Sequence, residues 1–255
     1  MPTVGVEFAK VSYTLPRSAD GKIGRVLLRD ISLELEAGTT TALLGRSGSG
    51  KTTLLRMVNR LVLPTSGEVR VAGKATRDYD TVGLRRGIGY VIQETGLFPH
   101  MTVERNAGMA LELAGRSKDE IVARVGEVLG LVGLEYEEFQ ARYPWQLSGG
   151  QRQRVGLARA LATDPMVLLM DEPFGALDPL TRAEMQTMLR GLLERVGKTV
   201  LLVTHDLDEA LYLAKRVVFL SEGAVAADML AGEVPGSNNS YVKDYVSAVH
   251  RVVQA

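Results

Sequence analysis

The 255-residue sequence contains no cysteine. Disulfide bonds, thiolate metal sites and thiol nucleophiles are therefore excluded, and this composition suits a reducing cytosol. Long apolar runs are also missing, since no stretch approaches the roughly 18 consecutive apolar residues that a membrane span requires. The segment from Met1 to Lys10 lacks the basic start and apolar run of a signal peptide, so we expect none.

An excess of either charge is absent as well. Lys plus Arg and Asp plus Glu each number 30, which gives a formal net charge of zero. This balance does not favour nucleic acid, and we expect no nucleic-acid partner. Apolar residues make up 45% of the chain, which is enough for a full hydrophobic core.

Short apolar runs alternate with helical segments over most of the chain. The part up to about Gly38 is predicted to be strands joined by a polar loop at 17–25. Strand-like runs that alternate with helices indicate an α/β fold with a mostly parallel sheet covered on both faces. The further strands are predicted at 40–44, 67–72, 87–92, 166–170, 199–203 and 217–220.

The middle of the chain has helical periodicity from Thr102 to about Gly133. Ser117 and Glu120 have capping-box spacing, and the apolar residues after them fall on one helical face. We therefore predict a helical subdomain of about residues 95–160, inserted into a domain that spans 1–232. Residues 233–255 are predicted to form a tail with a short terminal helix.

A glycine-rich loop joins the strand at 40–44 to a helix predicted at 52–61, and it fits G-x-x-x-x-G-K-[ST]. Its glycines let backbone N–H groups surround a phosphate, and the helix start adds a positive dipole. Lys51 would reach the β- and γ-phosphates, and the Thr52 hydroxyl would ligate Mg²⁺. The alternative is an ordinary Gly/Ser turn. The candidate phosphate-binding residues are Gly45, Ser47, Gly48, Ser49, Gly50, Lys51, Thr52 and Thr53.

Two adjacent carboxylates, Asp171 and Glu172, end the apolar run that starts at Val167. Asp171 would hold the Mg²⁺ shell, and Glu172 would polarise a water for in-line attack. The alternative is a strand capped by surface acids. GTPases, kinases, helicases and transporter ATPases all use a phosphate loop, so these two motifs name no single function.

The most specific motif is Leu-Ser-Gly-Gly-Gln at 147–151. Ser148, Gly149 and Gly150 precede a predicted helix, so they offer N–H groups to an anion, although a Gly turn before a helix is the alternative. From Tyr13 to the last helix, the sequence resembles the ATP-binding subunits of ABC transporters. The motifs follow that family's order, namely Gly45–Thr52, Gln93, Leu147–Gln151, Val167–Glu172, Ala176–Asp178 and His205.

The resemblance implies a P-loop NTPase core with an N-terminal antiparallel β subdomain, and ATP and Mg²⁺ as ligands. It also implies a head-to-tail dimer with a second ATPase subunit, in which Ser148, Gly149, Gly150 and Gln151 meet the γ-phosphate held by the other copy.

Individual roles also come from the resemblance. Gln93 matches a glutamine that senses Mg²⁺ and the attacking water, and His205 matches the switch histidine that contacts the γ-phosphate. Tyr13 matches the aromatic residue that stacks on adenine, and Asp178 matches an aspartate that couples the two sites. Each of these residues also has a structural alternative. Taken alone, Gln93 would more often be a surface residue, His205 a hydrogen-bonded structural histidine and Tyr13 a core residue of a strand.

Import is favoured because the ATPase is a chain without membrane spans. The stretches 89–102, 171–182 and 241–246 are similar to the quaternary-amine (glycine betaine, choline, carnitine) uptake group. The resemblance implies a peripheral subunit at the cytoplasmic face of the membrane, with transmembrane permease subunits and, indirectly, an extracytoplasmic substrate-binding protein. Many members carry C-terminal regulatory domains, for which we expect no room here.

Other ABC classes remain as alternatives. An importer of amino acids, oxyanions or polyamines, or a lipid-trafficking complex, would use much the same cassette, because the partners select the substrate. DNA-repair and chromosome-organising ATPases are disfavoured, since only about 95 residues without heptads separate the phosphate loop from the 147–151 motif. A ribosome-acting protein would need two cassettes in one chain.

Overall fold

The computed structural model describes residues 4–16, 24–93 and 95–250. Most of the polar loop predicted at 17–25 lies outside the described residues. The chain divides into two compact units, Met1–Tyr79 with Leu201–Ala255, and Asp80–Val200. Among the described residues, no helix is both long enough and apolar enough to cross a membrane.

The first unit contains an antiparallel sheet. Its strands are β1 (Val4–Thr14), β2 (Val26–Glu36), β4 (Ser66–Val71) and β5 (Lys74–Ala75), in the order β2-β1-β4-β5. All three neighbouring pairs run antiparallel. Side chains on β2 alternate between core and solvent, as expected for a strand with one buried face. The predicted N-terminal antiparallel β subdomain is therefore confirmed.

The strand that precedes the phosphate loop lies in a second sheet. The order of its neighbours is β10 (Ala224–Leu230), β9 (Arg216–Ser221), β3 (Thr40–Leu44) and β8 (Thr199–Val203). Of β8, the residues from Leu201 onward belong to the first unit. β3 pairs parallel with β9, whereas β10 is an antiparallel neighbour of β9. Four of the five residues of β3 are buried, as expected for a strand covered on both faces.

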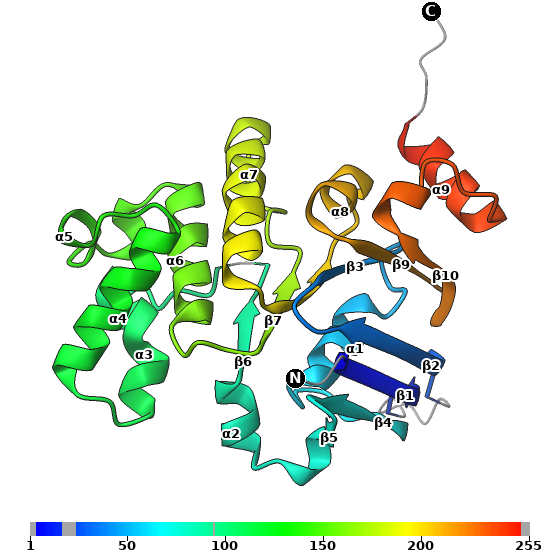
Figure 1. Cartoon of the computed structure of the whole chain (residues 1–255), viewed down its shortest axis with the longest axis horizontal. Helices are drawn as coiled ribbons and strands as arrows, with labels where there is room; N and C mark the ends of the chain where they lie inside the picture. The colour runs from blue at the N-terminus through cyan, green and yellow to red at the C-terminus, as the bar shows by residue number, and fades with distance from the viewer. Residues whose placement is uncertain (1–3, 17–23, 94, 251–255) are drawn as a thin grey trace, which may run out of the picture. The chain divides into compact units, whose positions relative to one another are not determined.

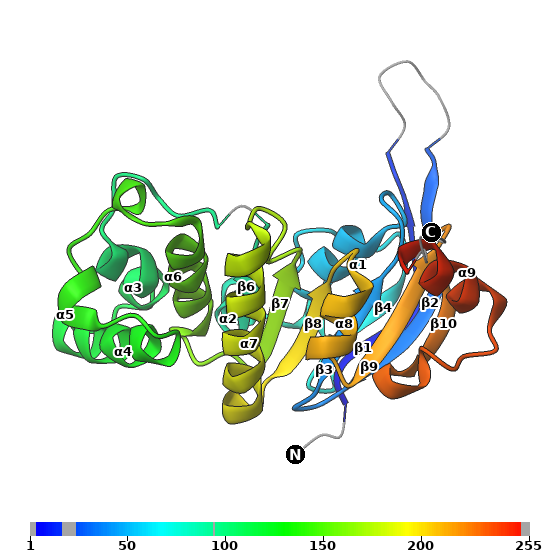
Figure 2. The ribbon, with the colours of Figure 1, turned by 90° about the horizontal axis from the view of Figure 1, so that it is seen from above.

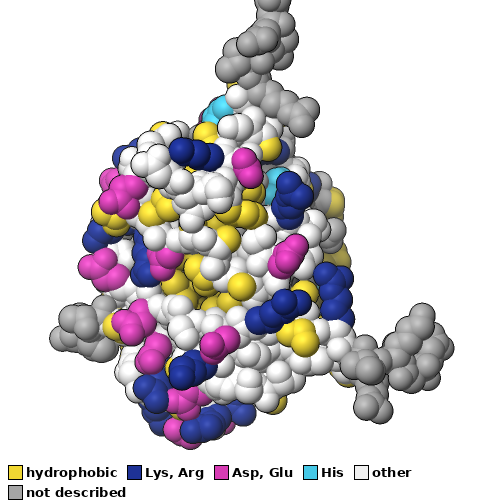
Figure 3. Space-filling view, turned by 90° about the vertical axis from the view of Figure 1, so that its right-hand side faces the viewer, with side chains coloured by type: hydrophobic (Ala, Val, Ile, Leu, Met, Phe, Trp, Pro, Cys, Tyr) yellow, Lys and Arg dark blue, Asp and Glu magenta, His cyan; other side chains and the backbone are white. Residues whose placement is uncertain are grey.

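Helices α1 (Lys51–Val58), α8 (Leu207–Leu213) and α9 (Ser240–Val249) complete the first unit. Figures 1 and 2 show α9 close to β10 and the end of the chain. One hydrophobic cluster joins residues of β3, α8, β9, β10 and α9. On the face shown in Figure 3, charges of both signs surround a central group of hydrophobic side chains, so neither sign dominates.

The second unit combines a parallel strand pair with a group of helices. β6 (Ile88–Val91) pairs in parallel with β7 (Val167–Asp171). Helices α3, α4 and α6 pack on one another beside the short α5 (Figure 1). The helices of this unit are α2 (Thr81–Arg86), α3 (Val103–Leu113), α4 (Lys118–Leu131), α5 (Tyr136–Phe139), α6 (Gly149–Leu161) and α7 (Pro179–Val196).

The predicted helix at 52–61 is shorter than expected. Arg60 has a left-handed backbone with φ 56°, and the N–H groups of Leu61 and Val62 both bond back to the carbonyl of Arg56. This hydrogen-bond pattern closes a helix, so α1 ends at Val58. The capping box predicted at Ser117 and Glu120 is confirmed at the start of α4.

Candidate functional site

The phosphate loop of the first unit begins α1 without a side-chain cap. Gly50 occupies the cap position with φ 101°, and no side-chain hydrogen bond caps the helix. The ammonium of Lys51 is buried and donates to the carbonyl oxygens of Gly45, at 2.7 Å, and Arg46, at 3.1 Å. A cation and a helix start are therefore held together at one loop, which is the chemistry that binds a phosphate.

Glycine is required in this loop because neighbouring segments come very close. A Cβ at Gly45 would lie 2.2 Å from the carbonyl oxygen of Leu220, and one at Gly50 would lie 2.6 Å from a methyl carbon of Leu28. The Oγ of Ser49 is buried and has no hydrogen-bond partner among the described residues. That hydroxyl remains available to a ligand. Thr52 and Thr53, which follow Lys51 in α1, are half-buried.

His205 lies in the same unit, just after β8. The N–H of Thr204 donates to the carbonyl of Leu43, at 3.3 Å, and Leu43 stands two positions before Gly45. The exposed His205 is therefore placed beside the strand that leads into the phosphate loop. Tyr13 is half-buried on β1 and pairs with Leu28 of β2, whose side chain also meets Gly50.

The two predicted acids lie in the second unit at the end of β7. Asp171 is buried, and its carboxylate accepts a hydrogen bond from the Tyr90 hydroxyl at 3.3 Å. Glu172 has φ 46°, a conformation that non-glycine residues rarely adopt and that is concentrated at functional sites.

Gln93 and Glu172 face the same small space. A Cβ placed on Gly175 would lie 3.7 Å from the Gln93 amide nitrogen and 3.9 Å from a Glu172 carboxylate oxygen. Gly175 also donates its N–H to the Glu172 carbonyl, at 3.2 Å. The structure therefore brings together two of the three residues predicted to be catalytic.

The motif at 147–151 forms the start of α6, but not quite as predicted. We expected Gly149 and Gly150 to precede the helix, whereas both lie inside its first turn and Ser148 is the cap residue. The cause is a reciprocal capping box in which Ser148 accepts from the Gln151 N–H, at 3.2 Å, and donates its own N–H to the Gln151 side chain, at 2.9 Å.

Asp178 lies close to this motif. It caps α7, and hydrogen bonds from the hydroxyl and N–H of Thr181 hold the pKa of the exposed Asp178 below its usual range. A Cβ on Gly150 would lie 2.7 Å from a Thr181 methyl, and one on Gly149 would lie 3.5 Å from Leu177. Ser148 and Asp178 therefore begin two adjoining helices.

Two residues at this end of the second unit were not predicted. Tyr90 bonds to Asp171, and Arg159 of α6 donates to the carbonyls of Thr95 and Gly96, both at 2.7 Å. Burial lowers the pKa of Arg159, which nevertheless stays charged because an arginine titrates far above neutral pH. Arg159 therefore ties the loop after Gln93 to the helix that begins at Ser148.

The donor set suits Mg²⁺ rather than a softer metal. In the second unit, Asp171 and Gln93 offer a carboxylate and an amide oxygen, and Asp171 is buried with its carboxylate bound by the Tyr90 hydroxyl. In the first unit, Thr52 offers a hydroxyl. Among the described residues, no three His, Cys, Asp or Glu side chains gather into a metal cluster. Mg²⁺ needs few protein ligands when phosphates and water supply the others.

Comparisons with known proteins show the family of this chain. The ABC transporter family model matches residues 28–175. The glycine betaine uptake system ATP-binding protein YehX of Escherichia coli (strain K12) is 50% identical over 198 residues, which cover 78% of this chain and 64% of that protein. The sulfate/thiosulfate import ATP-binding protein CysA of Nocardia farcinica (strain IFM 10152) is 52% identical over 199 residues, which cover 78% and 59%.

A solved structure confirms the predicted fold class. The dimeric post-hydrolysis state of the ATP-binding cassette MJ0796, bound to ADP and Pi, has a TM-score of 0.77 at 35% identity, covering 89% of this chain and 98% of that one. The chain belongs to the ABC transporter family. It spans about three fifths of the length of the curated relatives it matches.

Proposed function

We propose that this chain binds Mg·ATP at the phosphate loop and hydrolyses it to drive import through a separate permease. The observation that carries the proposal is the buried ammonium of Lys51, held against the carbonyls of Gly45 and Arg46 at the uncapped start of α1. The family match supports it, because the phosphate loop and both acids lie within the matched residues 28–175.

The other residues complete the reaction chemically. Asp171, Gln93 and Thr52 would hold Mg²⁺, which neutralises charge on the β- and γ-phosphates when bound. Glu172 would polarise the attacking water, and its carboxylate and the Gln93 amide already face one small space. His205 would contact the γ-phosphate, and Tyr13 would stack on adenine.

Two copies of the chain would form the working unit. The start of α6 offers Ser148, Gly149, Gly150 and Gln151, with a helix dipole, to the γ-phosphate of the other copy. The cassette MJ0796 was solved as a dimer with ADP and Pi, which supports this assembly. Asp178 begins the adjoining helix and would connect the two sites.

A titration with Mg·ATP tests the nucleotide site. Lys51→Ala removes a buried cation that bonds at the loop, so the Kd should rise by about 100-fold or more, since hydrogen bonds to charged groups contribute roughly 1.5–3 kcal/mol each. Lys74→Ala is the matched control. Lys74 belongs to β5 and its ammonium lies over the Tyr79 ring, so its removal should leave the Kd for Mg·ATP unchanged. Unchanged affinity in Lys51→Ala would refute the site.

A groove in the second unit is our candidate for permease contact. It encloses about 320 Å³ between α2, β6, α3 and α6. Leu113 and Val82 on its lining are 72% and 54% exposed, and Arg85 and Arg86 flank them. Exposed large apolar side chains at a groove are typical of protein interfaces. We propose that an apolar segment of the permease docks here.

We propose a quaternary amine as the imported solute, on the similarity of stretches 89–102, 171–182 and 241–246 to that uptake group. Sulfate is the second candidate, because the relative named for sulfate import is as similar as the one named for glycine betaine. This similarity fits a cassette whose substrate is selected by its partners.

Uptake assays distinguish the candidates. A strain that lacks this chain and competing importers should lose uptake of labelled glycine betaine, choline or carnitine and keep sulfate uptake. Loss of sulfate uptake alone would refute the amine proposal. Complementation with Leu113→Glu should fail to restore uptake while the purified variant hydrolyses ATP normally, whereas full restoration would refute the groove as the permease contact.

A further inference from the structure

The C-terminal helix α9 reaches the backbone of His205. The hydroxyl of Tyr245, in the middle of α9, donates a hydrogen bond of 3.0 Å to the carbonyl oxygen of His205. The two residues are 40 positions apart in the sequence, and both belong to the first unit. This contact therefore depends on how α9 packs.

Both ends of α9 are fixed. At its start, Asn239 accepts a hydrogen bond from the Val242 N–H, at 3.2 Å, and donates to the Ala226 carbonyl of β10, at 3.3 Å. Beyond its last turn, His250 lies 3.3 Å from the carboxylate of Asp208 in α8. The helix that carries Tyr245 is thus tied to a strand and to the helix that follows His205.

The Tyr245 ring is held by its neighbours. It packs edge-on against Phe219 of β9, with ring centroids 5.5 Å apart and an interplanar angle of 73°. Burial, followed by the neighbouring Tyr241 and Asp206, raises the pKa of Tyr245 to about 12. The hydroxyl therefore stays protonated and able to donate at any physiological pH.

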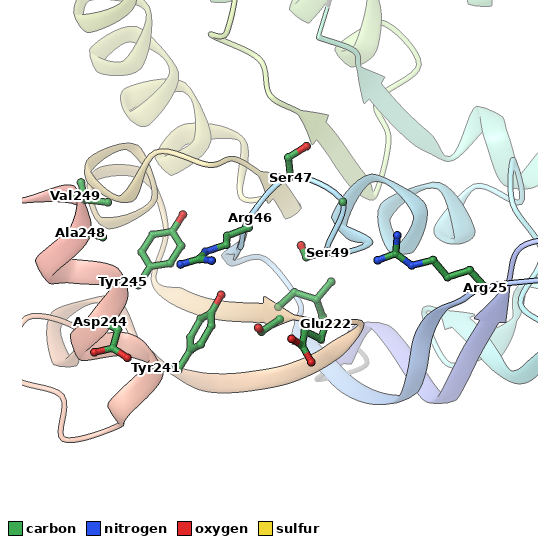
Figure 4. Close-up of a pocket in the computed structure, with 13 residues that line it drawn as sticks. Arg25, Arg46, Ser47, Ser49, Glu222, Tyr241, Asp244, Tyr245, Ala248 and Val249 are labelled. Atoms are coloured by element: carbon green, nitrogen blue, oxygen red, sulfur yellow. The ribbon is translucent and has the colours of Figure 1, made fainter.

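Tyr245 also lines a cavity of about 540 Å³ beside the phosphate loop. Tyr241 and Tyr245 of α9 form one wall, and Arg46, Ser47 and Ser49 of the loop form another. In Figure 4, the Arg46 side chain extends from the loop toward Tyr245. Helix α9 thus contacts His205 and also lines a cavity with the phosphate loop. These are the two segments of the first unit that would contact the phosphates.

The His205 peptide has supports on either side. The N–H of Thr204 bonds to Leu43, and the N–H of Asp206 bonds to the Thr204 hydroxyl at 3.0 Å. Tyr245 binds the His205 carbonyl, which belongs to the same peptide as the Asp206 N–H. Holding this carbonyl restrains the backbone at His205, and with it the Cβ from which the exposed imidazole projects.

We propose that Tyr245 is a positioning residue for His205, holding its carbonyl so that the imidazole points at the γ-phosphate. The proposal rests on the proposed function, which assigns His205 to the nucleotide. It gives the tail at 233–255 a part in hydrolysis, through the backbone of the switch histidine rather than through contact with ATP.

The test is Tyr245→Phe, which removes the hydroxyl and keeps the ring packed on Phe219. Rates are normalised to protein that binds Mg·ATP, so any unfolded fraction is discounted. We expect kcat to fall about 3- to 10-fold, the usual effect of losing one hydrogen bond, with the Kd for Mg·ATP and the Tm unchanged.

The matched control is Tyr241→Phe. Tyr241 also packs edge-on against Phe219, at 6.2 Å, and its hydroxyl has no hydrogen-bond partner among the described residues. This variant should keep the wild-type kcat. An equal loss of kcat in both variants, or a wild-type kcat in Tyr245→Phe, would overturn the proposal.

A double-mutant cycle separates positioning from general support. In a His205→Ala background, adding Tyr245→Phe should not lower the residual rate further, because the hydroxyl acts through His205. The same fold-loss in both backgrounds would overturn the proposal. If His205→Ala alone keeps the wild-type rate, the assignment of His205 fails and the positioning role fails with it. If His205→Ala is inactive and Tyr245→Phe is not impaired, only the positioning role fails.

Discussion

At the scale of single residues, the phosphate loop depends on close approaches that only glycine permits. Gly50 combines φ 101° with a neighbour, Leu28, that would lie 2.6 Å from any Cβ. Gly73, in the turn between β4 and β5, has a similar φ of 80°, but nothing lies within 4 Å of the same position. The two glycines therefore both have a positive φ and differ in crowding.

Gly50→Ala should lower the free energy of unfolding by about 2–4 kcal/mol, since left-handed strain and overpacking act together. Gly73→Ala should cost only about 1 kcal/mol, from strain alone. Urea denaturation without nucleotide measures both. Equal losses would show that contact with Leu28 does not constrain the loop.

The sequence predicted the motif residues but not their partners. The predicted motif residues belong to short contiguous patterns, in which the neighbouring residues indicate the chemistry. They include Lys51, Ser148, Asp171 and Glu172. Tyr90 and its partner Asp171 are 81 positions apart, and Arg159 is 64 positions from the carbonyl of Thr95. Such contacts arise from tertiary packing, so no local sequence pattern predicts them.

At the scale of elements, two helices begin with the same device. Ser117 and Glu120 form a capping box at α4, and Ser148 and Gln151 form another at α6. Both boxes satisfy N–H groups at a helix start, but only the second belongs to the motif at 147–151. Comparing the two capping boxes therefore distinguishes the structural effect of a helix cap from a role in binding.

Ser117→Ala and Ser148→Ala should each cost about 1 kcal/mol of stability, the usual effect of losing such a cap. In the Glu172→Gln background, only Ser148→Ala should also weaken ATP-dependent dimerisation, because only Ser148 would face the phosphate of the other copy. Thermal denaturation and analytical ultracentrifugation give the two readouts. Equal weakening of the dimer by Ser117→Ala would contradict this assignment.

Elements with a clear apolar pattern were predictable, and an element with a mixed pattern was missed. The strand at 199–203 appears with the predicted bounds, because it is an uninterrupted buried run. β10 was missed since its short sequence mixes buried and exposed positions without a regular alternation. It pairs with β9 through a tight turn at Glu222 and Gly223, both of which have positive φ.

At the scale of the whole molecule, the proposed hydrolysis needs residues from both compact units. The first unit supplies the phosphate loop and His205, and the second supplies Asp171, Glu172 and Gln93. The motif that starts at Ser148 would act on the nucleotide of a second copy. The central claim is therefore that hydrolysis and assembly depend on each other.

Size-exclusion chromatography with light scattering of Glu172→Gln in Mg·ATP tests this claim most directly. The substitution keeps the shape of the side chain and removes the base, so hydrolysis should fall by roughly 10²–10⁴ and the ATP-bound dimer should accumulate. Wild type should be mainly monomeric, and adding Ser148→Arg should abolish the dimer by placing a bulky cation at the phosphate-facing surface. A Glu172→Gln protein that stays monomeric at high concentration, or that hydrolyses ATP at the wild-type rate, would contradict the account.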